Sequence, residues 1–216
     1  MVAQGFTQVY GVDYFDNFFA KPLIGGVRLL IAFILHHKLK KVSADVSGAF
    51  LNANLRETIY LQLPPGIKFG GSQHVRLLKS LYGLKQASID WYLLLDEIIT
   101  AFDPELKRSK TDSCIYIKVT EDCIFIDSVH VDDYGIGYSN QKYYDDFIEH
   151  YRRHVAFTIS EEFDYMLQMK LEWTANTVTL SQNKQIAALC KKFGQQDNHV
   201  SPVTPMQPKT NILKGD

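Results

Sequence analysis

Two adjacent carboxylates, Asp132 and Asp133, are the residues of this 216-residue chain that most directly suggest chemistry. Apolar and β-branched runs before them, from Cys123 to Val131, and after them, to Tyr138, predict two strands joined by a tight turn. Neighbouring carboxylates repel unless water or a cation separates them, so an acidic tip on a buried hairpin suggests a divalent metal. Aspartate is also common in ordinary turns, and for the pair taken alone this plainer interpretation is favoured.

A third carboxylate, Asp45, lies near the end of a strand expected over residues 41–46. From Val42 onward the expected order is strand, helix, strand pair, helix and strand, as in the split β-α-β-β-α-β fold, whose first strand lies beside the middle pair. Asp45 is therefore expected to approach Asp132 and Asp133. Three carboxylates at neighbouring strand ends suit two-metal nucleotidyl transfer, with ions about 3.5–4 Å apart. With Asp45 included, the metal interpretation becomes the better one.

Hydrophobic periodicity predicts the elements that position these carboxylates. Helices are expected around residues 27–35, 85–102 and 140–151, and from Gln182 to Gly194, the last burying Ile186, Leu189 and Phe193. Strands are expected over residues 41–46, 59–63, 75–79, 114–119 and 123–131. The alternation over residues 163–173 is the clearest strand signal, and residues 178–180 are expected to pair with it.

Composition restricts the class of protein. A formal net charge of −1 counts against a nucleic-acid binder that relies on an overall basic field. The three cysteines show no paired spacing, which argues against a disulfide framework or a zinc site and favours a reducing compartment. No signal peptide or membrane-length apolar run is recognised. We expect an intracellular protein, cytoplasmic or nuclear and not secreted, without a membrane partner.

Five sequence blocks occur in a fixed order. They are Val2-Ala3-Gln4-Gly5-Phe6-Thr7-Gln8, Gly11-Val12-Asp13-Tyr14, Ala44-Asp45-Val46 with Ala49-Phe50-Leu51-Asn52, Ser80-Leu81-Tyr82-Gly83-Leu84-Lys85-Gln86-Ala87 with Trp91-Tyr92, and Val131-Asp132-Asp133. In these blocks the chain resembles the reverse transcriptase domain of copia-type LTR retrotransposons, along almost its whole length. A lone Val-Asp-Asp would be weak evidence, but five ordered blocks are highly specific.

The resemblance implies an α+β fold of the right-hand polymerase type, with fingers and a palm of the split β-α-β-β-α-β kind. It places the fingers mainly in residues 1–37 and 51–85 and the palm mainly in 38–50 and 86–181. Residues 182–200 would begin a thumb or connection, and 201–216 would form a linker-like tail. The implied activity is copying RNA or DNA into DNA.

The resemblance also implies the ligands of two Mg²⁺ ions, for which Mn²⁺ could substitute. Asp45 and Asp132 would be the main ligands, Asp133 the third carboxylate, and the Val46 backbone carbonyl an additional ligand. Mg²⁺ prefers such oxygen donors and needs few from the protein.

Two further residues match positions that contact the substrate in this family. Phe50, five positions after Asp45, matches the aromatic that blocks a ribose 2′-hydroxyl, and Gln86 matches the residue that contacts the incoming sugar. A core phenylalanine and a helix-capping glutamine are the plainer alternatives. The implied partners are a primed RNA or DNA template, deoxynucleoside triphosphates, and the ribonuclease H and integrase regions of a parent polyprotein, which are absent here.

Several departures from the family lie near the expected site. His130 replaces a tyrosine, Gln168 replaces a glycine, and Asp127 lies in a strand expected to be apolar. An unpaired buried carboxylate there would cost several kcal/mol or stay protonated. Ser88-Ile89-Asp90 stands where the family has proline and a basic residue, which adds negative charge beside a polyanionic substrate.

The chain starts inside the family's first fingers strand and stops before ribonuclease H, so we expect a truncated or decaying copy of an element. The first hypothesis is an RNA-directed DNA polymerase domain that performs two-metal nucleotidyl transfer to a primer 3′-hydroxyl. The alternative is a catalytically dead remnant that acts at most as a binding or interaction module. A third option is another palm enzyme, such as a nucleotide cyclase; the motif blocks outside the palm argue against it.

Overall fold

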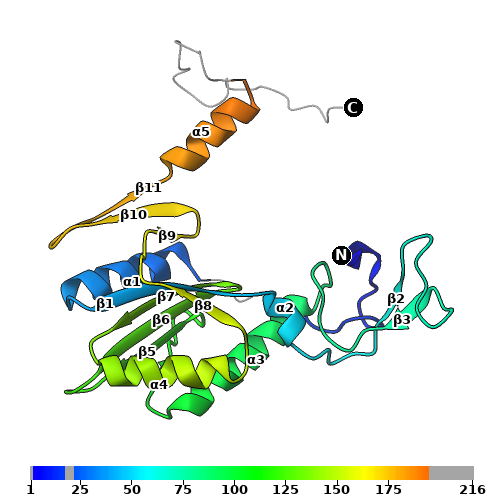
Figure 1. Ribbon diagram of the computed structural model, residues 1–216, viewed down its shortest axis with the longest axis horizontal. Helices are drawn as coiled ribbons and strands as arrows, with labels where there is room; N and C mark the ends of the chain where they lie inside the picture. The colour runs from blue at the N-terminus through cyan, green and yellow to red at the C-terminus, as the bar shows by residue number, and fades with distance from the viewer. Residues whose placement is uncertain (1, 18–21, 195–216) are drawn as a thin grey trace. The chain divides into compact units, whose positions relative to one another are not determined.

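The computed structural model describes residues 2–17 and 22–194 (Figure 1). The helices are α1 (Ile24–His36), α2 (Ala49–Asn52), α3 (Ala87–Phe102), α4 (Gln141–Arg152) and α5 (Asn183–Lys192), with a 3-10 turn at Gly5–Thr7. The strands are β1 (Lys40–Val46), β2 (Tyr60–Gln62), β3 (His74–Arg76), β4 (Lys107–Arg108), β5 (Ile115–Val119), β6 (Ile124–His130), β7 (Asp133–Tyr138), β8 (Phe157–Ser160), β9 (Tyr165–Met166), β10 (Met169–Trp173) and β11 (Val178–Ser181). This mixture of helices and antiparallel strands confirms the predicted α+β class.

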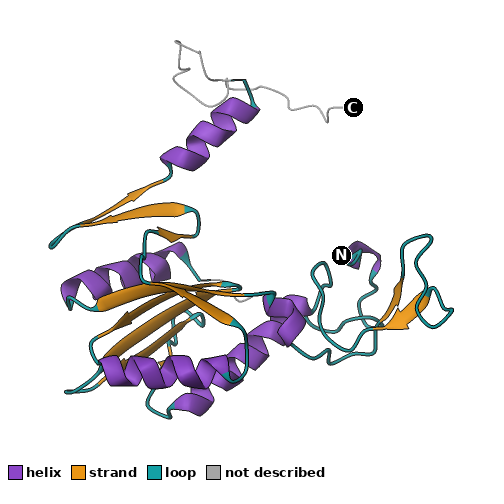
Figure 2. Cartoon of the chain, in the orientation of Figure 1, coloured by secondary structure: helices purple, strands orange, loops and turns teal. Residues whose placement is uncertain are grey.

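A six-stranded antiparallel sheet forms the centre of the unit that spans Met1–Leu180, in the order β4-β5-β6-β7-β1-β8. Helices α3 and α4 pack on one face and α1 on the other, and each face has its own buried apolar cluster (Figure 2). The central strand β6 is covered on both sides, with Phe125 and Val129 in one cluster and Ile126 in the other. Residues 125–129 of this strand are accordingly all buried.

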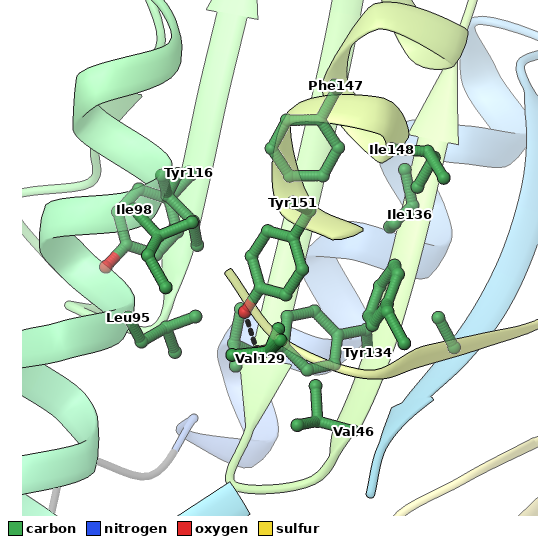
Figure 3. Packing of buried hydrophobic residues seen from close by; sticks show 14 of the residues in the cluster. Val46, Leu95, Ile98, Tyr116, Val129, Tyr134, Ile136, Phe147, Ile148 and Tyr151 are labelled. Carbon is green, nitrogen blue, oxygen red and sulfur yellow. Dashed lines mark hydrogen bonds between the residues drawn. The ribbon is translucent and has the colours of Figure 1, made fainter. Parts of the chain in front are cut away.

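The larger cluster fills the space between the sheet and helices α3 and α4 (Figure 3). Its buried members include Leu95 and Ile98 of α3, Phe147, Ile148 and Tyr151 of α4, and Tyr116, Val129, Tyr134 and Ile136 of the sheet. The Tyr134 and Tyr151 hydroxyls hydrogen-bond each other inside this core. The phenols therefore satisfy each other where water does not reach.

The predicted strand over residues 163–173 is wrong, because the chain reverses within it. Leu167 and Gln168 have φ angles of 50° and 63°, and they separate β9 from β10. With β11, these strands form a separate three-stranded sheet. The strand beside β1 is instead β8, a segment of four residues for which no strand was predicted. The predicted pairing of residues 178–180 with this region is confirmed.

Helix α5 lies where it was predicted, but its predicted burial is wrong. Ile186, Leu189 and Phe193 are 55%, 48% and 66% exposed. The helix belongs to a second compact unit, Ser181–Asp216, whose described part ends at Gly194 and offers no further helix to pack against. The predicted tail over residues 201–216 lies outside the described residues. Within the described part of the chain, no helix has the length and apolarity needed to cross a membrane.

The start of α1 is held by a carboxylate from a distant loop. Asp112 Oδ2 accepts a hydrogen bond from the Leu23 N–H at 2.9 Å, and Asp112 Oδ1 accepts one from the Cys114 N–H at 3.0 Å. Leu23 precedes the helix and its own side chain cannot cap it. Asp112 therefore satisfies a helix-terminal donor that would otherwise be left without a partner.

We expect Asp112→Ala to lower the free energy of unfolding by about 1–2 kcal/mol, because two backbone donors lose a charged acceptor. Urea denaturation measures the change. Asp122→Ala, at an exposed turn aspartate, is the matched control and is expected to have little effect. Equal stabilities of the two variants would contradict this role of Asp112.

Candidate active site

Strand β1 brings the first carboxylate to the acidic hairpin. Asp45 lies directly opposite Asp133 in the antiparallel ladder of β1 and β7. The Val46 N–H donates to the Asp132 carbonyl at 2.9 Å, and this bond holds the backbone of Asp132 beside β1. The predicted approach of Asp45 to this pair is thus observed in the backbone. It follows from the insertion of β1 between β7 and β8.

The hairpin turn lies one residue earlier than predicted. β6 ends at His130 and β7 begins at Asp133, so only Val131 and Asp132 connect the strands and Asp133 is a strand residue. Val131 has φ = +54°, a conformation that two-residue hairpins usually assign to glycine. For a β-branched residue such a conformation costs about 1–3 kcal/mol and persists only where the surroundings impose it. The turn that carries Asp132 is therefore strained.

The carboxylates interact electrostatically. The pKa of Asp132 is raised, first by partial burial and then by the charges of Asp45 and Asp133, while a hydrogen bond from Tyr82 opposes the shift. Partial burial and Asp45 likewise raise the pKa of Asp133, which His130 partly offsets. Within residues 2–17 and 22–194, no lysine or arginine forms an ion pair with any of the three. Their mutual repulsion is what a bound cation would relieve.

The oxygen atoms of these carboxylates suit a hard cation, although the described residues do not enclose a metal site on all sides. Among the described residues, no group of three or more His, Cys, Asp or Glu side chains is arranged so that it could hold a metal ion. Mg²⁺ usually takes only one or two protein carboxylates and completes its shell with water and substrate phosphates. Asp45, Asp132 and Asp133 supply the oxygen chemistry that this coordination requires. The metal roles of these residues and of the Val46 carbonyl remain predictions.

Tyr82 belongs to this site, although the sequence analysis assigned it no role. Its hydroxyl lies 3.3 Å from Asp132 Oδ2 and donates to it, and its ring centroid lies 4.7 Å from that of Phe50. Burial and the neighbouring Asp132 raise the pKa of the Tyr82 phenol. Tyr82 therefore connects Phe50, the predicted sugar-selecting residue, to Asp132. Its membership of a sequence block was the only signal that could have identified it.

Gln86 is fully buried rather than displayed at a surface. Its Nε2 donates to the Asp13 carbonyl at 3.0 Å, and its Oε1 accepts from Gln8 Nε2 at 2.9 Å. It precedes α3 but makes no side-chain capping bond, so the capping alternative is wrong. In this structure Gln86 ties the N-terminal segment to the start of α3. Its predicted sugar contact remains a prediction.

The expected negative charge of Asp90 is compensated inside the protein. Its side chain is fully buried, Arg56 Nε pairs with its Oδ1 at 2.7 Å, and the Ser80 hydroxyl donates to its Oδ2 at 2.8 Å. The carboxylate therefore does not face a nucleic acid. The expectation that Asp90 repels the substrate is wrong, because Arg56 lies close enough to neutralise it.

Asp127 is buried as the sequence predicted. Its exposure is 0%, and neither carboxylate oxygen has a hydrogen-bond partner. It lies on β6 opposite Tyr116 of β5 and Ile136 of β7, on the strand that both apolar clusters cover. Burial raises its pKa well above the usual range, which favours the protonated, neutral form of the side chain.

Comparison with known proteins identifies the family of the chain. The profile of the family described as reverse transcriptase (RNA-dependent DNA polymerase) matches residues 1–208. The retrovirus-related Pol polyprotein from transposon TNT 1-94 of Nicotiana tabacum is 28% identical over 99% of the chain, and that from transposon RE1 of Arabidopsis thaliana is 26% identical over 98%. The matches span 16% and 14% of those proteins.

A shorter match reaches a yeast element. The Transposon Ty1-NL2 Gag-Pol polyprotein of Saccharomyces cerevisiae is 36% identical over 39% of the chain, and the match spans 5% of that protein. Together with the ordered motifs and the site described above, these findings support the predicted copia-type resemblance. The chain belongs to the reverse transcriptase family, by family an RNA-directed DNA polymerase, and is similar to part of the Pol polyproteins of retrotransposons.

Proposed function

We propose that this chain carries the polymerase site of its domain and joins deoxynucleotides to a primer 3′-hydroxyl on an RNA or DNA template. Asp45 and Asp132 are the main ligands of two Mg²⁺ ions, which Mn²⁺ can replace, with Asp133 as the third carboxylate and the Val46 carbonyl as an additional ligand. The observation that carries this proposal is the ladder pairing of Asp45 with Asp133 beside Asp132.

The reaction forms a bond between the primer 3′-oxygen and the α-phosphorus and breaks the bond from that phosphorus to the oxygen that bridges it to the β-phosphate. Pyrophosphate leaves, and the proton of the 3′-hydroxyl passes to water. When bound, the metal ions make the 3′-hydroxyl a better nucleophile and stabilise charge on the leaving oxygen. Asp45 and Asp132 supply the negative charge that holds them, and the Tyr82 hydroxyl orients Asp132. Phe50 packs on Tyr82 and excludes a ribose 2′-hydroxyl. Gln86 supports the start of α3, and because its side chain is fully buried, a contact with the sugar of the incoming nucleotide requires that side chain to become exposed.

We assign the palm to the sheet with its two helices. The order β6-β7-β1-β8, with α3 and α4 packed on the same face, fits a split β-α-β-β-α-β unit. Residues 1–37 and 51–85 are assigned mainly to fingers, and 182–200 to the start of a thumb or connection. In this arrangement the carboxylates lie at one end of the palm sheet, where a primed template has access to them.

A second candidate is a folded remnant without polymerase activity. The buried, unpartnered carboxylate of Asp127 favours it, because that residue destabilises the hairpin that carries Asp132. The two candidates differ in whether the chain incorporates nucleotides, not in the fold.

Primer extension with oligo-dT on poly-rA, dTTP and Mg²⁺ tests the proposal. We expect incorporation that requires the template, stops when EDTA removes the metal, and does not occur with dGTP alone. Absence of incorporation would favour the inactive remnant. Pyrophosphate release from a nucleotide without template would indicate a different palm enzyme.

A further inference from the structure

An indole from α3 reaches the strained turn of the hairpin. Trp91 is 2% exposed, and its Nε1–H donates to the backbone carbonyl of Val131 at 2.9 Å. Val131 is the residue with φ = +54° and directly precedes Asp132. The bond therefore joins helix α3 to the backbone of the residue before Asp132, and so restrains the position of Asp132.

Both residues of the turn are held through their carbonyls by other elements. Trp91 donates to the Val131 carbonyl, and the Val46 N–H of β1 donates to the Asp132 carbonyl at 2.9 Å. Because valine does not favour a positive φ, the turn depends on such external restraints.

Little room for water exists beside the indole in the wild-type chain. Trp91 and Val131 line the same small cavity, of about 10 Å³, between α3 and the sheet. A cavity of this size holds about one water molecule at most. Removal of the indole donor takes away the hydrogen bond from α3 to the Val131 carbonyl and leaves the turn less restrained.

We propose that Trp91 is a positioning residue: it holds the Val131–Asp132 turn in its left-handed conformation and thereby places the Asp132 carboxylate for metal binding. The effect on metal binding rests on the proposed function, whereas the effect on the turn does not. Trp91 itself touches neither metal nor substrate.

The chain offers a matched control. Trp173 Nε1 donates to the Phe163 carbonyl at 2.7 Å, which is the same bond type outside the hairpin. Trp91→Phe and Trp173→Phe each remove one indole donor and keep an aromatic ring. Val131→Asn supplies a residue that tolerates a positive φ and therefore depends less on the indole.

Two measurements on the full chain test the proposal. Electron paramagnetic resonance gives the Mn²⁺ dissociation constant, which Trp91→Phe is expected to raise about tenfold, as loss of a supporting contact often does. Trp173→Phe is expected to leave it unchanged, and Val131→Asn combined with Trp91→Phe to recover part of the loss. An unchanged constant in Trp91→Phe, or equal changes in both tryptophan variants, would overturn the proposal.

Urea unfolding of the same variants examines the turn without metal. Trp91→Phe is expected to lower the folding equilibrium constant both in wild type and in Val131→Asn. The factor by which it lowers the constant is expected to be at least about threefold smaller in the Val131→Asn background. Additive effects would overturn the proposal even if the chain binds metal. If wild type binds no Mn²⁺, the proposed function fails, and so does the inference that Trp91 places Asp132 for metal binding. Non-additive effects of Trp91→Phe and Val131→Asn on unfolding would still support the inference that Trp91 holds the turn.

If Trp91→Phe does not fold, hydrogen exchange of the indole N–H groups in the wild-type chain tests the proposal instead. Because coupling is reciprocal, Mg²⁺ is expected to slow exchange of the Trp91 Nε1–H and not that of Trp173. In a wild-type chain that binds metal, equal exchange with and without Mg²⁺ at Trp91 would overturn the proposal.

Discussion

Asp127→Val is expected to raise the free energy of unfolding at pH 7 by about 2–4 kcal/mol, because a buried, unpartnered polar group is replaced by an apolar one. The site is fully buried on β6, and neither carboxylate oxygen has a hydrogen-bond partner. Valine fits the strand because it is β-branched and close in size to aspartate. Urea denaturation at pH 7 measures the change.

The pH dependence of the gain follows from the raised pKa. In the unfolded chain Asp127 ionises near its ordinary pKa of 3.8, whereas burial keeps it protonated in the folded chain to a much higher pH. Above about pH 4 the folded state therefore binds more protons than the unfolded state, so this residue lowers wild-type stability as the pH rises. The advantage of Asp127→Val is expected to be smallest at and below about pH 4 and to grow as the pH rises above it.

Asp127→Asn separates charge from polarity. The amide cannot ionise, so the pH-dependent part of the difference is expected to disappear. Its buried N–H and C=O groups still need partners, so less stability is recovered than with valine. A wild-type chain at least as stable as Asp127→Val at pH 7 would show that Asp127 has a partner that compensates its burial.

Asp132→Asn and Asp45→Asn are each expected to reduce primer extension by about 10³-fold or more, because each removes a charge that holds the metal ions. Three orders of magnitude correspond to about 4 kcal/mol in the activation free energy. Single-nucleotide incorporation rates at saturating Mg²⁺ measure the effect. Asp122→Asn, at the exposed turn between β5 and β6, is the control that keeps the wild-type rate. Wild-type rates in Asp132→Asn would refute the assigned site.

The approach of Asp45 to the hairpin could be predicted because it depends only on the order of the elements. Periodicity and the split β-α-β-β-α-β pattern placed β1 beside β7 without any side-chain detail. Tyr82 and Trp91 could not be found in this way. Their contacts with Asp132 and Val131 depend on where a single hydroxyl and a single indole point, and no hydrophobic pattern encodes that direction.

The wrong predictions have physical causes. Polarity continues to alternate through Leu167 and Gln168, although both residues have positive φ angles and reverse the chain. The family that the chain resembles has a glycine at position 168, and a glycine there would have indicated the turn. Gln168 gives no such signal. In α5, periodicity showed that Ile186, Leu189 and Phe193 share a face, but it cannot show whether another element covers that face.

The number of metal ions bound at the carboxylates tests the central proposal most directly. Electron paramagnetic resonance can count Mn²⁺ ions bound to the chain in complex with template, a primer ending in a dideoxynucleotide and the matching deoxynucleoside triphosphate. Two ions per complex are expected in wild type and one, held by the triphosphate, in Asp132→Asn. Equal numbers in the two proteins would contradict the assignment of Asp132 as a metal ligand.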